Sequence, residues 1–229
     1  MNAEIVTIGA ELLLGQIVDT NAQWLARQLA GLGLRLQRKT TVGDDTEQIV
    51  AALQTAMAAS RVVITSGGLG PTVDDKTREA VALATERDLV LDKSLLAGIE
   101  AMFYSRGWIL GTSQQRQAFV PAGAVPMPNP VGTAPCFAVE HRGCWIIVLP
   151  GVPRELKYMF TNVVAPFLRE RVELTTHIRS RTFRTVGIGE GPLGDLLHDV
   201  MEAAHPAVGT LAHPGMVDVR AVVTGEDLA

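Results

Sequence analysis

The sequence is poor in cysteine, has no excess of basic residues and has no long apolar run. Its two cysteines are too few for a disulfide framework or for a zinc site built from cysteines. The 20 Lys and Arg residues are outnumbered by 24 Asp and Glu residues, which disfavours a protein that works by neutralising nucleic-acid phosphates. No run of about 18 apolar residues is present to span a bilayer. We therefore expect neither nucleic acid nor a membrane as a partner.

The chain is rich in apolar residues instead. Hydrophobic residues make up 47% and charged residues 19% of the chain, which is enough to bury a sizeable core and excludes a disordered chain. The first residues include Glu4 and Glu11 and lack the basic stretch of a secretory leader. These features predict a soluble protein, and we expect it to be cytoplasmic.

Two periodicities alternate over the first part of the chain. Short runs rich in β-branched residues at 3–9, 34–42 and 61–65 are typical of strands. The first two are followed by apolar residues at helical spacing, behind the capping residues Asp19 and Asp45. Strands that alternate with amphipathic helices predict an α/β fold, with a mostly parallel sheet covered on both faces.

The rest of the chain reads as helices, one hairpin and a small appendage. Residues 74–87 and 92–107 have the spacing of helices, and Arg142-Gly143 marks the turn of a β-hairpin. Pro153 suits the first turn of a helix that runs to about Arg171. Beyond that helix the order of patterns predicts a βαββ unit. We therefore divide the chain into a domain over residues 1–172 and a small α+β appendage over 173–229.

The segment SGGLGPTVDDKT, residues 66–77, is the strongest local signal. Its glycines follow a buried strand and let backbone N–H groups approach a phosphate. Asp74 and Asp75 come at the predicted start of a helix, where one carboxylate can cap amides and the other can face Mg²⁺. A tight turn with an ordinary cap is the alternative. We predict catalytic roles for Asp74, Asp75 and Lys76, and substrate contacts from Ser66, Gly67, Gly68, Gly70, Thr72 and Thr77.

Two other loops, residues 9–21 and 150–155, are predicted to meet this segment at the carboxyl edge of the sheet. Each is typical of a cap or turn when taken alone, but together they place carboxylates around the Gly-rich loop, which suits metal-assisted phosphate chemistry. A third segment, NPVGT at 129–133, is a turn by composition that could also bind a base or ribose. From these segments we predict a metal-binding role for Glu155. We predict substrate contacts from Glu11, Asn21, Gly151, Asn129, Gly132 and Thr133.

Six motifs in order along residues 3–165 resemble the N-terminal domain of the CinA family, the competence/damage-inducible proteins, which is related to the molybdopterin-binding MoaB/MogA fold. Residues 180–225 resemble the smaller KH-like part of the same family. The six motifs are IGAELLLGQIVDTNAQWLARQL, TTVGDDTEQI, ITSGGLGPTVDDKTREAVA, RQAFVPAGA, NPVGTAPCF and VLPGVPRELKYMF.

The resemblance implies a three-layer α/β/α sandwich, a homodimer and a metal-dependent hydrolysis of ADP-ribose to AMP and ribose 5-phosphate, in the recycling of NAD derivatives. The nucleotide substrate would place its pyrophosphate on the Gly-rich loop. A divalent ion, Mg²⁺, Mn²⁺ or Co²⁺, would polarise it. The residues implied are Gly67, Gly68 and Gly70 for the pyrophosphate, and Asp74, Asp75 and Glu155 for the metal.

Two departures from the family pattern bear on function. Family members usually carry a C-terminal amidohydrolase domain, so we predict no deamidation by this chain, expect the 173–229 appendage to be incomplete, and consider a separate amidohydrolase partner. Cys136 stands where the family has Gly, and its side chain could narrow the pocket or strain a turn that needs a positive φ. Two other functions stay open: a molybdopterin-binding module of molybdenum cofactor metabolism, and a non-catalytic interaction protein.

Overall fold

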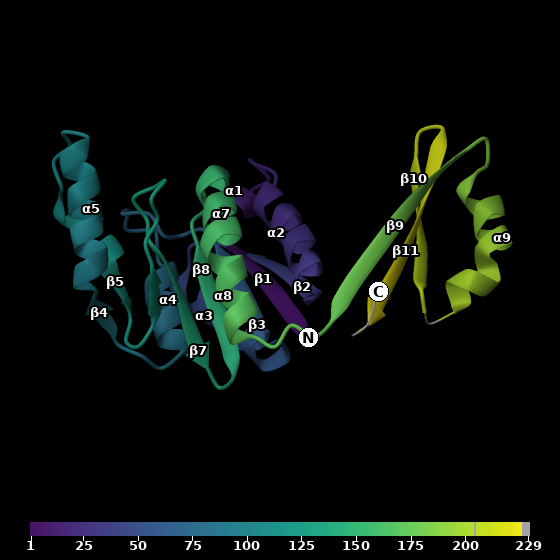
Figure 1. Ribbon diagram of the computed structural model, residues 1–229. Coiled ribbons are helices and arrows are strands. Elements are labelled where there is room, and N and C mark those ends of the chain that lie inside the picture. Colours follow the sequence, from purple (N-terminus) through teal and green to yellow (C-terminus); the bar gives the residue numbers. More distant parts are fainter. Residues whose placement is uncertain (204, 226–229) are drawn as a thin grey trace. The chain divides into compact units, whose positions relative to one another are not determined.

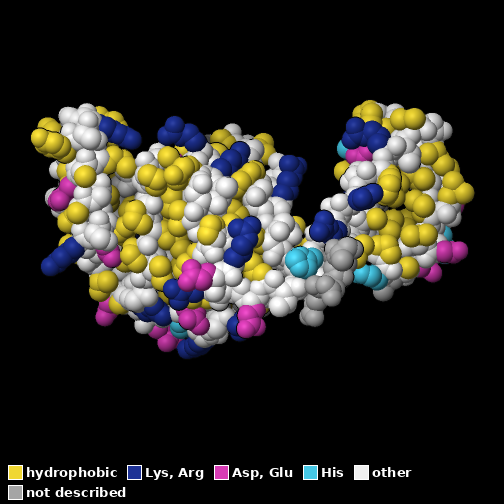
Figure 2. Space-filling view, viewed as in Figure 1, with side chains coloured by type: hydrophobic (Ala, Val, Ile, Leu, Met, Phe, Trp, Pro, Cys, Tyr) yellow, Lys and Arg dark blue, Asp and Glu magenta, His cyan; other side chains and the backbone are white. Residues whose placement is uncertain are grey.

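The computed structural model in Figure 1 describes residues 1–203 and 205–225. The chain divides into two compact units: Met1–Leu29 with Arg35–Glu173, and Ala30–Leu34 with Leu174–Ala229. Within the predicted appendage, residues 204 and 226–229 lie outside the described residues. Basic and acidic side chains are both scattered over the face of the larger unit seen in Figure 2, in keeping with the small net charge.

The larger unit is built on a six-stranded sheet with the order β2-β1-β3-β8-β7-β6. The first four strands in this order pair in parallel. β7 pairs antiparallel with β8, and β6 pairs antiparallel with β7. The prediction of a mostly parallel sheet is therefore confirmed. The strands are β1 (Asn2–Ile8), β2 (Arg35–Val42), β3 (Val62–Ser66), β6 (Val125–Met127), β7 (Cys136–His141) and β8 (Cys144–Leu149).

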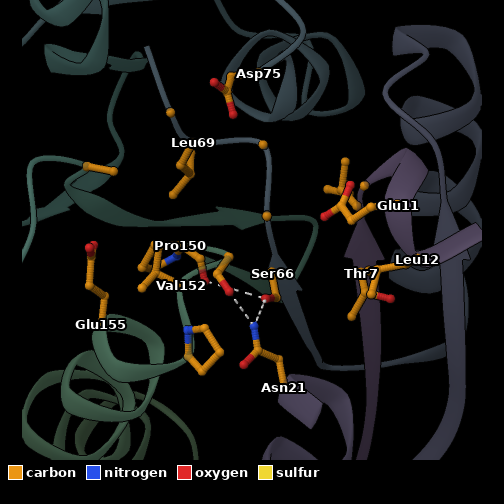
Figure 3. Close-up of a pocket in the computed structure, with 18 of the residues that line it drawn as sticks. Thr7, Glu11, Leu12, Asn21, Ser66, Leu69, Asp75, Pro150, Val152 and Glu155 are labelled. Atoms are coloured by element: carbon orange, nitrogen blue, oxygen red, sulfur yellow. Dashed lines mark hydrogen bonds between the residues drawn. The ribbon is translucent and has the colours of Figure 1, made fainter. Parts of the chain in front are cut away.

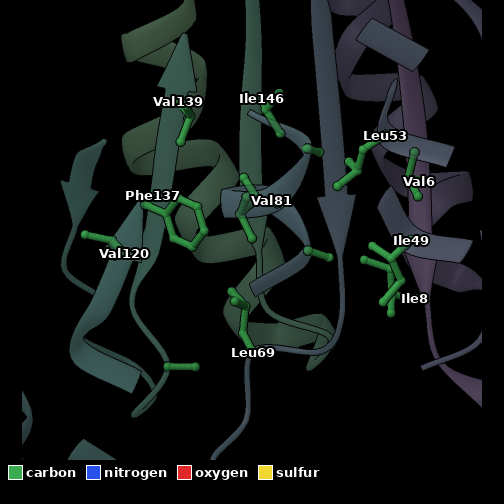
Figure 4. Close-up of a cluster of buried hydrophobic side chains, with 14 of the residues drawn as sticks. Val6, Ile8, Ile49, Leu53, Leu69, Val81, Val120, Phe137, Val139 and Ile146 are labelled. Atoms are coloured by element: carbon green, nitrogen blue, oxygen red, sulfur yellow. The ribbon is translucent and has the colours of Figure 1, made fainter. Parts of the chain in front are cut away.

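Helices cover both faces of this sheet, which gives the three-layer sandwich (Figure 1). On one face α3 (Thr46–Ala59) and α4 (Thr77–Ala84) bury Leu53 and Val81 against Val6 and Ile146 (Figure 4). Successive strand residues point to opposite faces, so the fully buried Ile5, Ile64 and Ile147 face the other layer. There α2 (Thr20–Gly31) packs Trp24 edge-to-face on Phe160, with ring centroids 5.5 Å apart.

The helix predicted from Pro153 to Arg171 forms with one irregular turn. It consists of α7 (Pro153–Met159), a π-helical turn η2 (Phe160–Val164) and α8 (Ala165–Arg171). Pro166 has no N–H to donate to a carbonyl in the preceding turn, and the wider π turn at that point accommodates this loss.

Short elements fill the stretch between α4 and β6. β4 (Leu89–Leu91) pairs antiparallel with β5 (Phe119–Pro121), an element that the proline-rich sequence did not predict. The other helices described in the larger unit are α1 (Ala10–Leu13), α5 (Lys93–Ser105), α6 (Thr112–Gln115) and the 3-10 turn η1 (Arg116–Ala118). Within the described residues, we find no helix with both the length and the apolar character needed to cross a membrane.

The smaller unit has the predicted βαββ order. β9 (His177–Val186), α9 (Glu190–Glu202), β10 (Ala207–His213) and β11 (Met216–Gly225) form an antiparallel sheet of order β10-β11-β9 with one helix. Leu193 of α9 packs on Val217 and Val219. Arg184 makes two hydrogen bonds to the Asp218 carboxylate, at 2.8 and 3.1 Å, across the β9–β11 pair.

Candidate phosphate-binding cleft

A cleft of about 480 Å³ opens where β1, β3 and β8 end (Figure 3). Its volume lies within the range of about 300–1,000 Å³ found for small-molecule sites. The three loops that the sequence placed at this edge do meet there: residues from 9–21, 66–75 and 150–155 line the cleft, together with Thr133 and Ala134.

The start of α4 holds the carbonyl groups of the Gly-rich loop. Fully buried Thr77 donates from Oγ1 to the Gly67 carbonyl at 2.8 Å and from its backbone N–H to the Gly68 carbonyl at 3.2 Å. Arg78, which is 3% exposed, donates to the carbonyls of Leu69 at 2.8 Å and Gly70 at 2.7 Å. Four successive carbonyls are thus bonded to the first two residues of α4.

Peptide planarity turns this arrangement into an anion cradle. In a trans peptide the C=O and the following N–H point in opposite directions, so the amides of Gly68, Leu69 and Gly70 face away from α4. Within the described part of the chain, none of these three amides donates to a protein oxygen. We call them the cradle amides. All three residues line the cleft, and such a row of N–H groups binds phosphate oxygens.

Two glycines are needed for this path of the backbone. Gly67 has φ +107° and Gly68 has φ +64°, conformations that residues with a side chain rarely adopt. A Cβ on Gly67 would overlap the carbonyl oxygen of Ile8, and one on Gly68 would overlap the Thr77 hydroxyl. Glycine is therefore required at both positions for the backbone path that carries the cradle amides.

Asn21 ties the three loops together. Its Nδ2 donates to Ser66 Oγ at 3.1 Å and to the Gly151 carbonyl at 2.7 Å, so the start of α2, the end of β3 and the loop after β8 share one network (Figure 3). Asn21, Ser66 and Gly151 all line the cleft, and the first two are buried. These hydrogen bonds hold the three segments together at the base of the cleft.

Negative charge dominates the cleft wall. Six carboxylates line it, and among the described residues no Lys, Arg or His does. Asp19 caps α2 through the Ala22 amide, and Asp44 accepts from the Ala10 amide at 3.0 Å. The six cleft carboxylates are Glu11, Asp19, Asp44, Asp74, Asp75 and Glu155.

Glu155 is positioned by Asn129, a residue that the sequence analysis predicted to contact substrate. Buried Asn129 donates from Nδ2 to Glu155 Oε2 at 2.8 Å and to the Ala134 carbonyl at 3.0 Å. A Cβ on Gly132 would overlap the Glu155 carboxylate, so this carboxylate packs directly against the turn. Of the three candidates at 129–133, Thr133 alone lines the cleft, and Asn129 and Gly132 shape the surroundings of Glu155.

Several expectations for the 66–77 segment need correction. α4 begins at Thr77 instead of Asp74, because Asp75 Oδ2 accepts from the Thr72 amide at 2.9 Å and from its hydroxyl, which closes a turn ahead of the helix. Thr72, Lys76 and Thr77 do not line the cleft. The Thr77 hydroxyl is occupied by the loop carbonyl, so it supports the cradle amides without reaching a ligand.

The carboxylates expected to bind the metal do not converge on one point. In residues 1–203 and 205–225, no three His, Cys, Asp or Glu side chains gather closely enough to hold one ion. Figure 3 shows Glu11, Asp75 and Glu155 on separate sides of the cleft. Asp74, Asp75 and Glu155 therefore do not form a prebuilt metal site. Mg²⁺ commonly uses one or two carboxylates and completes its shell with water and ligand phosphates, and the cleft fits that mode.

Two supporting residues were not predicted from the sequence. Arg78 bonds the loop carbonyls as described, and Gln117, which is 1% exposed, donates to the Leu69 carbonyl at 3.1 Å. Neither position carries a pattern that separates a buried polar side chain from an exposed one. For Arg78, the nearest available signal is its position at the start of the helix that follows the Gly-rich loop.

Cys136 does not disturb the site. It is fully buried in β7 opposite Met127, it lacks a positive φ, and it does not line the cleft. Burial, and then the charge of Glu155, raise the pKa of its thiol, so it stays protonated. The departure from the family glycine is thus compatible with the strand.

Comparison with known proteins identifies the family. Residues 4–170 match the family described as "Probable molybdopterin binding domain", and residues 180–229 match "Damage-inducible protein CinA KH domain". The CinA-like protein of Deinococcus deserti is 42% identical over 226 residues, covering 98% of this chain and 55% of that protein. The CinA-like protein of Gemmatimonas aurantiaca is 46% identical over 203 residues, covering 87% and 47%. The chain spans about half the length of these relatives.

Solved structures give the same result. CinA from Thermoplasma acidophilum superposes with a TM-score of 0.67 at 35% identity, over 74% of this chain and 96% of that one. MoaB from Thermus thermophilus, at 18% identity and a TM-score of 0.53 over 76% and 95%, shares the fold. The chain belongs to the CinA family, with a MoaB/MogA-like domain followed by a CinA KH domain.

Proposed function

We propose that this protein hydrolyses the pyrophosphate of ADP-ribose to AMP and ribose 5-phosphate with the help of a divalent metal ion. The observation that supports this most is the meeting of the cradle amides with the six cleft carboxylates in one cleft. Amides bind phosphate oxygens, whereas carboxylates repel them unless a cation lies between. A pyrophosphate that arrives with Mg²⁺, Mn²⁺ or Co²⁺ satisfies both kinds of group.

The chain's own residues would divide the work. The cradle amides would bind and orient one phosphate, as donors already aimed at the site. Asp74 and Asp75 would hold the metal together with phosphate oxygens, and the bound metal would offset the charge that develops at phosphorus. Glu155 is fixed through Oε2 by Asn129, which leaves Oε1 for the metal or for the proton of an attacking water.

Release of AMP tests the proposal. The purified chain is incubated with ADP-ribose and Mg²⁺, Mn²⁺, Co²⁺ or EDTA, and AMP is followed by chromatography. We expect AMP with at least one metal, none with EDTA, and none from Asp75→Asn, which keeps an oxygen for the Thr72 amide but loses the charge. Glu100→Gln, on the exposed surface of α5, is the control and should match the parent chain. No AMP with any metal refutes the activity.

A molybdopterin-binding module is the second candidate. The matched family carries molybdopterin binding in its description, and the phosphate group of a pterin would suit the same cradle amides. Titration separates the two functions, because a pterin module binds molybdopterin or its adenylylated form and leaves ADP-ribose intact.

A further inference from the structure

Arg78 is an unusual cation in this structure. It is 3% exposed, and within the described residues it forms no ion pair with a carboxylate. By contrast, Arg38 and Arg184 have partly exposed side chains, and each donates two hydrogen bonds to one carboxylate. Burial lowers the pKa of Arg78, since water no longer stabilises its charge. The charges of Glu79 and Asp75 offset this effect only in part, because neither carboxylate is in ion-pair contact with the guanidinium. A buried charge without a directly bonded carboxylate is expensive to keep.

Arg78 lies where its charge can strengthen anion binding by the Gly-rich loop. Its guanidinium bonds the carbonyls of Leu69 and Gly70, directly behind the cradle amides. A charged donor on a carbonyl polarises the whole peptide group, so the Gly70 N–H on the other side becomes a stronger donor. The lining of the cleft has six carboxylates and, within the described residues, no cation. Arg78 is thus a positive charge bonded directly to the back of the loop that carries the cradle amides.

We propose that Arg78 determines the specificity of the cleft for anionic ligands over neutral ones, through its charge and not merely through loop support. A phosphate on the cradle amides would add an opposite charge in front of the loop that Arg78 bonds from behind, whereas a neutral ligand of similar shape would not. The proposal relies on the proposed function for the identity of the anion, but the charge preference applies to any phosphate ligand.

The test compares charged and neutral probes on Arg78→Gln, with Arg116→Gln as the matched control. Arg116 is a neighbouring cation whose side chain is 49% exposed and bonds Glu79, so its removal should change little. Binding of inorganic pyrophosphate with Mg²⁺ is measured by calorimetry, and binding of adenosine by NMR titration. At an effective dielectric constant of about 20, a unit charge behind the loop accounts for at least about tenfold in affinity for an anion bound in front of it.

We expect Arg78→Gln to lose at least about tenfold for pyrophosphate and less than about twofold for adenosine. Equal losses for both probes would mean that Arg78 only supports the loop, which overturns the proposal. Arg78→Lys keeps the charge and should preserve the preference for pyrophosphate. This second variant decides the matter if urea unfolding shows that Arg78→Gln does not fold, because a lost preference in Arg78→Lys also overturns the proposal.

Failure of the proposed function would look different. If the parent chain binds pyrophosphate but releases no AMP from ADP-ribose, the hydrolase is refuted while the charge preference is still measured. If the parent chain binds neither pyrophosphate nor ADP-ribose in the presence of metal, both proposals are wrong.

Discussion

The hydroxyl of Thr77 orients the cradle amides, and replacing it tests that geometry. Thr77→Val keeps the shape of the side chain but removes the donor that bonds the Gly67 carbonyl at 2.8 Å. Because Gly67 is buried, its carbonyl is left without a partner, which costs about 1–3 kcal/mol of unfolding free energy. The peptide between Gly67 and Gly68 is then free to rotate, and the Gly68 N–H no longer faces the cleft. Loss of one charge-assisted hydrogen bond, worth about 1.5–3 kcal/mol, weakens ligand binding roughly 10- to 150-fold.

Thr77→Ser is the matched control for this prediction. It deletes one buried methyl group, with a stability loss of about 1 kcal/mol, but keeps the hydroxyl. Urea unfolding and calorimetric titration with ADP-ribose and metal are measured on both variants. We expect both to lose stability but only Thr77→Val to lose affinity. If Thr77→Val binds as tightly as Thr77→Ser, the hydroxyl does not orient the loop and the reasoning is refuted.

Three further predictions concern other parts of the chain. Asn129→Leu frees the Glu155 carboxylate and should lower kcat for AMP release about tenfold with little change in KM, as steady-state kinetics would show. Arg184 lowers the pKa of Asp218 below 3.8, so this pair stabilises the smaller unit at neutral pH and the contribution disappears as the pH falls through that lower pKa. Urea unfolding from about pH 5 to about pH 2 should show a shallower loss for Arg184→Gln. Leu53→Ala, at a fully buried position, should cost about 2–5 kcal/mol in unfolding free energy and leave ligand affinity unchanged.

The regular elements could be predicted from the sequence because local signals carry them. Asp45 caps α3 by accepting from the Gln48 amide, as its position before an apolar periodic run predicts. Arg142 and Gly143 take positive φ at the β7–β8 turn, which follows from the dipeptide between two apolar runs. The meeting of three loops at one sheet edge follows from the shared direction of parallel strands.

The inward or outward direction of individual polar side chains could not be predicted. Thr77 and Asn129 were expected to contact substrate, yet both are buried and bond protein groups. Which groups a hydroxyl or amide bonds depends on tertiary neighbours such as Gly67 and Glu155, and single-sequence patterns carry no information on them. The burial of Arg78 could not be predicted for the same reason, because it depends on the packing of the Gly-rich loop against α4.

The central claim is that the cleft binds a pyrophosphate and a divalent cation together. Calorimetric titration with the α,β-methylene analogue of ADP-ribose, which resists hydrolysis, tests this most directly when it is done with Mg²⁺ and again with EDTA. The six cleft carboxylates repel an unaccompanied pyrophosphate, so we expect affinity to fall at least about tenfold in EDTA. Equal affinity with and without metal would contradict the account.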